Sequence, residues 1–225
     1  MTDHAPSPGP ILSIDTSTEQ AGIAIWHEER VGSLSWHAGR SHTVRLLDQV
    51  HRLLDLAGLE PGGLSAVAVA MGPGAFTGLR VGMSAAKGLC LALDLPVVGV
   101  STLAAAAAGA LCPGRPAVAA VAAGRGRLCW AAYERDGAGL PREVSAPVNA
   151  TPAELAAAIA AMPVPPIVTG ELGDAEGLIA GTGAVVVPAA LRPRRPEAML
   201  AIALPRIAAG ETDDPVTLEP VYLGR

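Results

Sequence analysis

Two hydrophobic patterns alternate along this chain, one typical of buried strands and the other typical of amphipathic helices. Short runs rich in Val, Ile and Ala, bounded by glycine, proline or polar residues, predict strands. These runs lie at 11–14, 21–26, 31–36, 66–71, 97–100, 117–122, 128–133, 167–170 and 184–187. Apolar residues at three- and four-residue spacing predict helices at 41–57, 78–93, 151–162 and 196–209, together with an alanine-rich helix that begins at 101 or 102.

The clearest of these helices spans 41–57. Its apolar side chains, Leu46 and Val50 among them, follow one side, and charged residues follow the other. Ser41 is the predicted N-cap and Gly58 the predicted C-terminal stop. The apolar stripe is wide enough for the helix to pack on a sheet and still offer an edge to another helix, although core packing alone also accounts for the pattern.

The order of the predicted elements indicates the fold class. Three strands are followed by helix, strand, helix, strand and helix, and Asp15 ends the first of two hairpin-connected strands. This arrangement resembles the opening lobe of the actin-like and sugar-kinase-like ATPase fold, a two-lobed, RNase H-like α/β architecture. We therefore expect a disordered tail at 1–10, a first lobe at 11–111 and a second lobe at 112–225, whose last helix can pack back on the first lobe.

Charge and hydropathy argue against two classes of protein, those that bind nucleic acid over a broad surface and those that span a membrane. The formal net charge is −5 and the sequence pI is about 5.5, which argues against a protein that grips nucleic acid over a broad surface by itself. We interpret the basic cluster of Arg192, Arg194 and Arg195 as a solvated face. The uncharged run 97–112 is shorter than the ~20 apolar residues that a membrane-spanning helix needs, so no membrane segment is expected.

The cysteines indicate a reducing compartment. Cys90, Cys112 and Cys129 are odd in number and form no C-x-x-C pair, so neither a disulfide framework nor a zinc site is predicted, and a cytoplasmic location fits best. Cys90 falls inside an apolar helix and is predicted to be a small buried side chain. The proline-rich first ten residues resemble neither a signal peptide nor a membrane anchor.

Candidate chemistry concentrates in the glycine-rich string that runs from Gly72 to Gly82, directly after a predicted strand. Glycine allows positive φ and close approach of another backbone or a ligand, which predicts a tight turn between strand and helix. Such a loop can also cradle a phosphate with backbone N–H groups, but the Lys and Ser/Thr of a P-loop and the spacing of G-x-G-x-x-G are missing. A structural turn and an anion or nucleotide site both stay open for the loop residues Gly72, Pro73, Gly74, Thr77 and Arg80.

The helix after this loop has two notable features. Thr77 is its predicted cap. Gly78 and Gly82, one helical turn apart, form a flat face that suits close packing against a strand or a second helix.

A polar turn, Asp15, Thr16 and Ser17, follows the first strand. In the actin-like fold that this region resembles, an Asp and its hydroxyl neighbours face the phosphates and magnesium, usually within Asp-x-Gly-Thr. The glycine of that pattern is missing here. The turn is therefore either a degenerate phosphate loop or an Asx or Ser/Thr turn that closes the hairpin.

Taken as a whole, the string Gly72 to Gly82 is specific. Together with Ile14-Asp15-Thr16-Ser17 and with Ser41-His42, it resembles the bacterial TsaB family, also known as YeaZ. The resemblance is dense over 11–103 and resumes in Pro196-Glu197-Ala198 and in the terminal 220–223. It implies the dimerization subunit in the synthesis of threonylcarbamoyladenosine in tRNA.

The resemblance also implies partners and a partner surface. It implies pairing with a catalytic TsaD-type paralogue, contact with a TsaE-type ATPase through the complex, a homodimer when the chain is alone, and indirect contact with tRNA. In this family the helix at 41–57 and the helix after the glycine loop form the subunit interface. The candidate interface residues are Val44, Leu47, Asp48, His51, Gly78, Gly82 and Ala85.

No catalytic site is predicted. The His-x-x-x-His metal pair of the catalytic relative is missing, because His37 and His42 are five residues apart and His51 is further along, so no metal ligand set is expected. Neither a G-x-S-x-G elbow nor a Cys, His and acid signature supports the older glycopeptidase description of the family. We expect no tightly bound cofactor, with ATP and Mg bound only weakly or in the partner subunit. The alternatives are an autonomous ATPase or small-molecule kinase that uses Asp15, and a bare interaction module.

Overall fold

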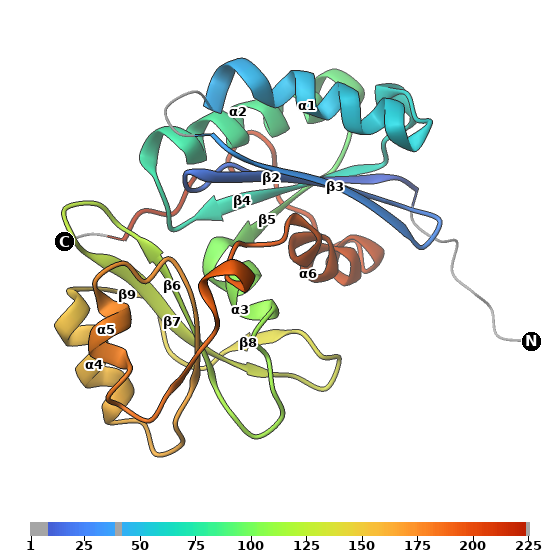
Figure 1. Cartoon of the computed structure of the whole chain (residues 1–225). Coiled ribbons are helices and arrows are strands. Elements are labelled where there is room, and N and C mark those ends of the chain that lie inside the picture. Colours follow the sequence, from blue (N-terminus) through green and yellow to red (C-terminus); the bar gives the residue numbers. More distant parts are fainter. Residues whose placement is uncertain (1–8, 39–41, 224–225) are drawn as a thin grey trace, which may run out of the picture.

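The computed structural model describes residues 9–38 and 42–223, apart from the side chains of residues 42–44. The chain forms two α/β lobes, each built on one sheet (Figure 1). Most of the predicted N-terminal tail, the predicted cap Ser41 and the side chain of Val44 lie outside the described residues.

The first lobe contains a five-stranded sheet with the strand order β3-β2-β1-β4-β5. Its strands are β1 (Ile11–Asp15), β2 (Gln20–His27), β3 (Arg30–His37), β4 (Ala66–Gly72) and β5 (Val97–Ser101). β1 pairs with β2 in antiparallel and with β4 in parallel, and β5 extends the parallel part. The inner strands read as continuous apolar runs because helices cover both faces of the sheet, whereas the edge strand β3 alternates between more and less exposed positions.

The second lobe contains a six-stranded sheet with the order β11-β10-β6-β7-β8, and β9 also pairs with β7. Its strands are β6 (Ala117–Ala122), β7 (Leu128–Arg135), β8 (Pro141–Glu143), β9 (Val148–Ala150), β10 (Ile167–Gly170) and β11 (Val185–Val186). The predicted hairpin of β6 and β7 is confirmed. The sequence missed β8 and β9, because strands of three residues carry no hydrophobic period and are ordered by the edge of β7.

The helices form layers on the two sheets (Figure 1). α1 (His42–Ala57) and α2 (Phe76–Leu93) cover the outer face of the first sheet, α3 (Thr102–Ala108) and α6 (Pro196–Ala208) lie between the sheets, and α4 (Pro152–Ala160) and α5 (Ala175–Ile179) cover the second sheet. α6 packs against β1, β2 and β5, so the last helix belongs to the layers of the first lobe. None of the helices that the structure describes is long and apolar enough to cross a membrane.

Local signals fix two of the helix starts, and a tertiary contact fixes a third. Ser101 caps α3, because its Oγ accepts a hydrogen bond from the N–H of Ala104 at 3.3 Å. Thr151 caps α4 as predicted and forms a capping box with Glu154. The predicted cap of α2 was wrong: the N-cap is Ala75, and Thr77 lies inside the first turn. The N–H of Ala75 donates to a backbone oxygen of the β1–β2 turn at 2.6 Å, and this contact sets where the helix begins.

After α6 the chain returns along the first lobe to the glycine-rich loop. The carboxylate of Asp213 accepts a hydrogen bond from the N–H of Gly99 in β5 at 2.7 Å. Leu218 is buried in the core of the first lobe. The N–H of Val221 donates to the backbone oxygen of Met71 at 2.6 Å, so the end of the described chain lies against the last residues of strand β4.

Candidate functional site

The glycine-rich loop between β4 and α2 is enclosed by two other segments of the same chain. Gly72 has a φ of +107°, and a Cβ there would lie 2.6 Å from the backbone oxygen of Val221. A Cβ on Gly74 would collide with the backbone oxygen of Ser17, and Pro73 between the two glycines is buried. The glycines are needed because two backbones approach the loop closely. This geometry favours a structural turn over a phosphate-binding loop.

The flat glycine face of α2 is directed toward the first sheet. Gly78 and Gly82 are buried, and a Cβ on Gly82 would collide with Oγ1 of Thr16. That hydroxyl donates a hydrogen bond to the backbone oxygen of Gly78 at 2.7 Å. The prediction that these glycines lie on an outward partner surface was therefore wrong, because both are buried and the missing side chain of Gly82 makes room for Thr16 of the β1–β2 turn. The Thr16 hydroxyl is thereby directed at the backbone of α2.

Asp15 closes the β1–β2 turn, and both of its carboxylate oxygens have partners. Its Oδ1 accepts hydrogen bonds from the backbone N–H of Ser17 at 2.9 Å and from the Ser17 hydroxyl at 2.5 Å. Its Oδ2 accepts from Nε of Arg194 at 2.9 Å. The first of these contacts is an Asx turn, which was one of the two interpretations of this segment.

Arg194 is the main site residue that the sequence did not reveal. It was grouped with Arg192 and Arg195 in a solvated cluster, but only 3% of its side chain is exposed. Besides Asp15, its guanidinium donates to the hydroxyl of Thr18 at 2.8 Å. Burial alone would lower the pKa of Arg194, but the charges of Asp15 and Glu171 outweigh burial and raise this pKa, so the guanidinium stays protonated.

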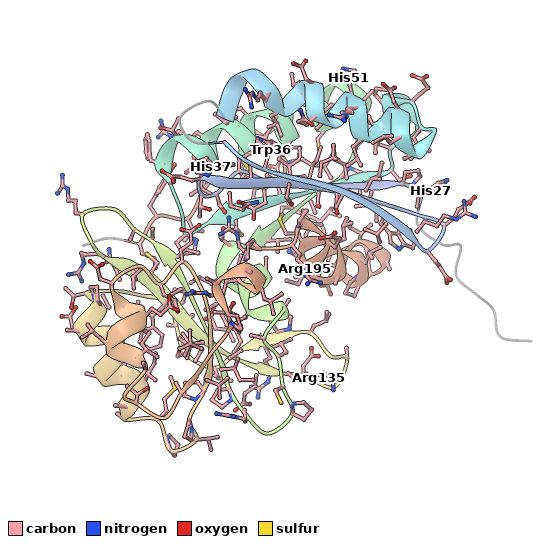
Figure 2. All side chains as sticks on the ribbon, in the orientation of Figure 1. His27, Trp36, His37, His51, Arg135 and Arg195 are labelled. Atoms are coloured by element: carbon pink, nitrogen blue, oxygen red, sulfur yellow. The ribbon has the colours of Figure 1, made fainter. Side chains whose placement is uncertain are left out.

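The other two arginines of the cluster behave differently. Arg192 pairs with Glu176 of α5, with 2.7 Å between Nη2 and Oε2. Arg195 is exposed, and Figure 2 shows it beside the start of α6. The prediction of a solvated face thus holds for Arg195. It was wrong for Arg192, whose side chain is 9% exposed beside Glu176, and for Arg194, because a carboxylate far away in the sequence draws that guanidinium into the interior.

A cleft of about 770 Å³ separates the two lobes beside this buried pair. One wall comes from the β1–β2 turn and α2, and the other from the end of β6 and the residue after β10. The polar lining residues are Thr18, Glu19, Gln20, His37, Asn149, Glu171 and Tyr222. Two of them, Glu19 and Glu171, are acidic, and Glu171 is paired with Arg194.

The outer face of α1 and α2 carries a second, more apolar groove of about 520 Å³. Leu47 is 53% exposed beside it, Asp48 and His51 are exposed on α1, and Ala85 of α2 is half-buried. The groove is lined by Leu46, Leu47, Phe76, Thr77, Arg80, Val81, Ser84 and Ala85. Thr77 and Arg80, which the sequence assigned to the glycine loop, therefore lie on this outer groove.

An aromatic and cationic cluster joins the groove to the cleft. The guanidinium carbon of Arg80 lies 3.9 Å from the ring centroid of Phe76, and the rings of Phe76 and Tyr222 are 5.3 Å apart. Nε of Arg80 also donates to the hydroxyl of Tyr222 at 3.3 Å. Phe76 is 55% exposed although it is the only phenylalanine of the chain. A large apolar side chain at the surface is a candidate for contact with a partner. The only sequence signal for this role was that the chain contains a single phenylalanine.

The histidines whose side chains the structure describes lie far apart on the first lobe. Figure 2 shows His27 at the tip of the β2–β3 hairpin, His37 at the other end of β3, and His51 on the outer side of α1. Among the described residues, no group of three or more His, Cys, Asp or Glu side chains could hold a metal ion.

Comparison with known proteins adds a family context. The model of the family described as "TsaD: tRNA N6-adenosine threonylcarbamoyltransferase" matches residues 20–166. The "tRNA threonylcarbamoyladenosine biosynthesis protein TsaB" of Escherichia coli is 34% identical over 95% of this chain and 94% of its own length. The Bacillus subtilis protein of the same name is 42% identical over 41% of either chain.

A comparison with solved structures points to the same family. The structure of YeaZ from Pseudomonas aeruginosa aligns with a TM-score of 0.80 at 30% identity, covering 95% of this chain and 100% of that chain. The predicted α/β class is thereby confirmed, and the chain shares the fold of YeaZ.

Proposed function

The chain belongs to the TsaB (YeaZ) family of proteins of tRNA threonylcarbamoyladenosine biosynthesis, and we propose that it acts there as a non-catalytic subunit. In this proposal it pairs with a TsaD-type catalytic paralogue through the outer face of α1 and α2. The paralogue carries out the transfer to tRNA adenosine, a TsaE-type ATPase joins through the complex, and tRNA is contacted mainly by the partner.

The observation that carries this proposal is the apolar groove between α1 and α2. Leu47 and Phe76 expose more than half of their surface beside it, and the partly buried Val81 and Ala85 also line it. Contiguous exposed apolar surface of this kind marks a protein interface more often than a free face. Because the sheet backs the two helices, the face is rigid and needs little ordering on binding.

A groove between two neighbouring helices is well suited to a partner that presents two helices of its own. The four helices then pack ridges into grooves around Leu47 and the small side chain of Ala85. A paralogue of the same fold can present such a pair, and so can a second copy of this chain. We therefore propose that the isolated chain forms a homodimer through the same face and exchanges it for the catalytic partner.

Nucleotide has no tight site of its own in this proposal. Both oxygens of the Asp15 carboxylate already accept hydrogen bonds, and Arg194 supplies its counter-charge, so little capacity remains for magnesium. We propose that ATP and Mg bind only weakly to this chain or bind in the partner subunit. This arrangement argues against the alternative of an autonomous ATPase. The Asp15→Asn variant should leave ATP binding by the isolated chain unchanged, whereas an ATPase would lose it.

The first experiment is light scattering on the purified chain, alone and mixed with the TsaD-type paralogue from the same organism. We expect a homodimer that converts into a one-to-one complex. In parallel, depletion of the chain in cells should remove threonylcarbamoyladenosine from tRNA. A chain that stays monomeric and forms no complex, or tRNA that keeps its modification, would contradict the proposal.

A matched pair of variants locates the interface. Leu47→Asp places a charge in the groove and should weaken the complex by ~100-fold or more, because burying an unpaired carboxylate is costly. Leu178→Asp is the control, since Leu178 is 50% exposed on α5 of the other lobe. Both variants should keep the melting temperature of the wild type within about 3 °C, because both side chains are half exposed. Equal affinities of the two variants would rule out this face as the interface.

A further inference from the structure

The two lobes meet at a buried cation that belongs to the chain itself. Arg194 stands in the connection between β11 and α6, where the chain passes from the second lobe to the first. We propose that Arg194 is an internal latch that holds the two lobes together beside the cleft, so that the chain's own side chains set the width of the cleft. This inference does not depend on the proposed partner.

The guanidinium is bonded on both sides of the cleft. Toward the first lobe, Nε donates to Asp15 at 2.9 Å, and Nη2 donates to the hydroxyl of Thr18 at 2.8 Å and the backbone oxygen of Gln20 at 3.2 Å. Toward the second lobe, Nη1 donates to Oε1 of Glu171 at 3.4 Å. A planar guanidinium with several fixed donors can join such separate acceptors in one geometry, which a flexible ammonium cannot do.

Glu171 is itself anchored in the second lobe. It directly follows β10, and its Oε2 accepts a hydrogen bond from the N–H of Ala122 at the end of β6. Asp15 is anchored in the first lobe as the last residue of β1. The latch therefore connects the carboxyl end of β1 in the first sheet to the carboxyl end of β10 in the second sheet.

Removal of this side chain leaves a specific defect. Asp15 is 3% exposed, so its carboxylate would stay buried with only Ser17 as a partner, and Glu171 would face it across the same space. A buried charge that loses its partner is strongly destabilising, and two carboxylates without a counter-ion repel each other. If the two walls of the cleft separate, water can reach the carboxylates of Asp15 and Glu171. This reduces both the cost of the buried charge and the repulsion between the two carboxylates.

The test compares Arg194→Met with Arg192→Met. Both variants remove one positive charge from the same connection, but Arg192 pairs with Glu176 inside the second lobe and touches no part of the first lobe through that pair. For Arg194→Met we expect a melting temperature lower by on the order of 10 °C. In native-state hydrogen exchange, amides at 16–20 and at 171–173 should both exchange at least about 10-fold faster.

The location of the change decides the outcome. Faster exchange on both walls in Arg194→Met, with changes in Arg192→Met restricted to α5 and its neighbourhood, supports the latch. Faster exchange confined to 192–196, or on one wall only, would overturn it, because Arg194 would then stabilise only its own connection. If Arg194→Met does not fold, Arg194→Lys is measured in its place, and the same two patterns decide.

Discussion

The orientation of the α2 glycine face can be tested by one substitution, Gly82→Val. A side chain at this position would meet Oγ1 of Thr16, which is 2% exposed and cannot move into solvent. Rotation of Thr16 would break its 2.7 Å hydrogen bond to Gly78, and a buried hydrogen bond lost in this way costs about 1–3 kcal/mol. The valine methyl groups add overpacking of about 1–3 kcal/mol against Ile14, partly offset by about 0.4 kcal/mol of better helix propensity. The expected net loss of unfolding free energy is about 3 kcal/mol.

The assay is urea denaturation followed by circular dichroism, at several protein concentrations so that self-association is separated from folding. Gly88→Val is the matched control, because Gly88 lies in the same helix and a Cβ there has nothing within 4 Å. We expect Gly88→Val to match the wild type within about 0.5 kcal/mol. If Gly82→Val instead kept wild-type stability but lost the dimer, Gly82 would face the partner and the orientation described above would be wrong.

Two further predictions concern titratable groups. The pKa of Glu154 is lowered from 4.5 by hydrogen bonds from the backbone and hydroxyl of Thr151, so its contribution to stability is present above about pH 4.5 and is lost as pH falls through the lowered value. Acid titration of Glu154→Gln should therefore show a smaller loss of melting temperature than the wild type, and parallel curves would contradict the capping box. Burial raises the pKa of Cys90 to about 11, which leaves about one thiolate in a thousand at pH 8. Iodoacetamide should modify the partly exposed Cys112 in the native protein and leave Cys90 and Cys129 unmodified until unfolding, as mass spectrometry of peptides can check.

Local sequence signals were sufficient for most of the fold. The apolar runs located the long strands, and hydroxyl caps such as Ser101 and Thr151 located helix starts, because these features act over a few residues. The same signals failed at Ala75, where the start of α2 is set by a backbone contact with the β1–β2 turn. Local propensity was overruled there by a tertiary contact.

The site was less predictable because its decisive contacts join distant residues. The Asp15–Arg194 pair spans 179 positions, and the Arg80–Tyr222 hydrogen bond spans 142. Nothing near Arg194 in the sequence distinguishes it from Arg192 or Arg195, so charge patterning could only suggest a solvated cluster. The glycines were recognised as sites of close approach, but the approaching groups, Val221 and the β1–β2 turn, could not be identified before the chain was folded.

The β1–β2 turn links the latch to the proposed partner face. Arg194 holds Asp15 at one end of the turn, while Thr16 donates to Gly78 and the backbone oxygen of Ser17 accepts from the N–H that opens α2. A shift of the turn therefore moves the first turn of α2, which carries Phe76 beside the groove. We predict that Arg194→Met weakens binding of the catalytic paralogue about 5-fold, the size of a modest coupling free energy, whereas Arg192→Met leaves it unchanged. Calorimetric titration of both variants measures this coupling. Equal affinities would show that the cleft and the helical face are energetically independent, since the turn would then absorb the loss of Arg194 without moving α2.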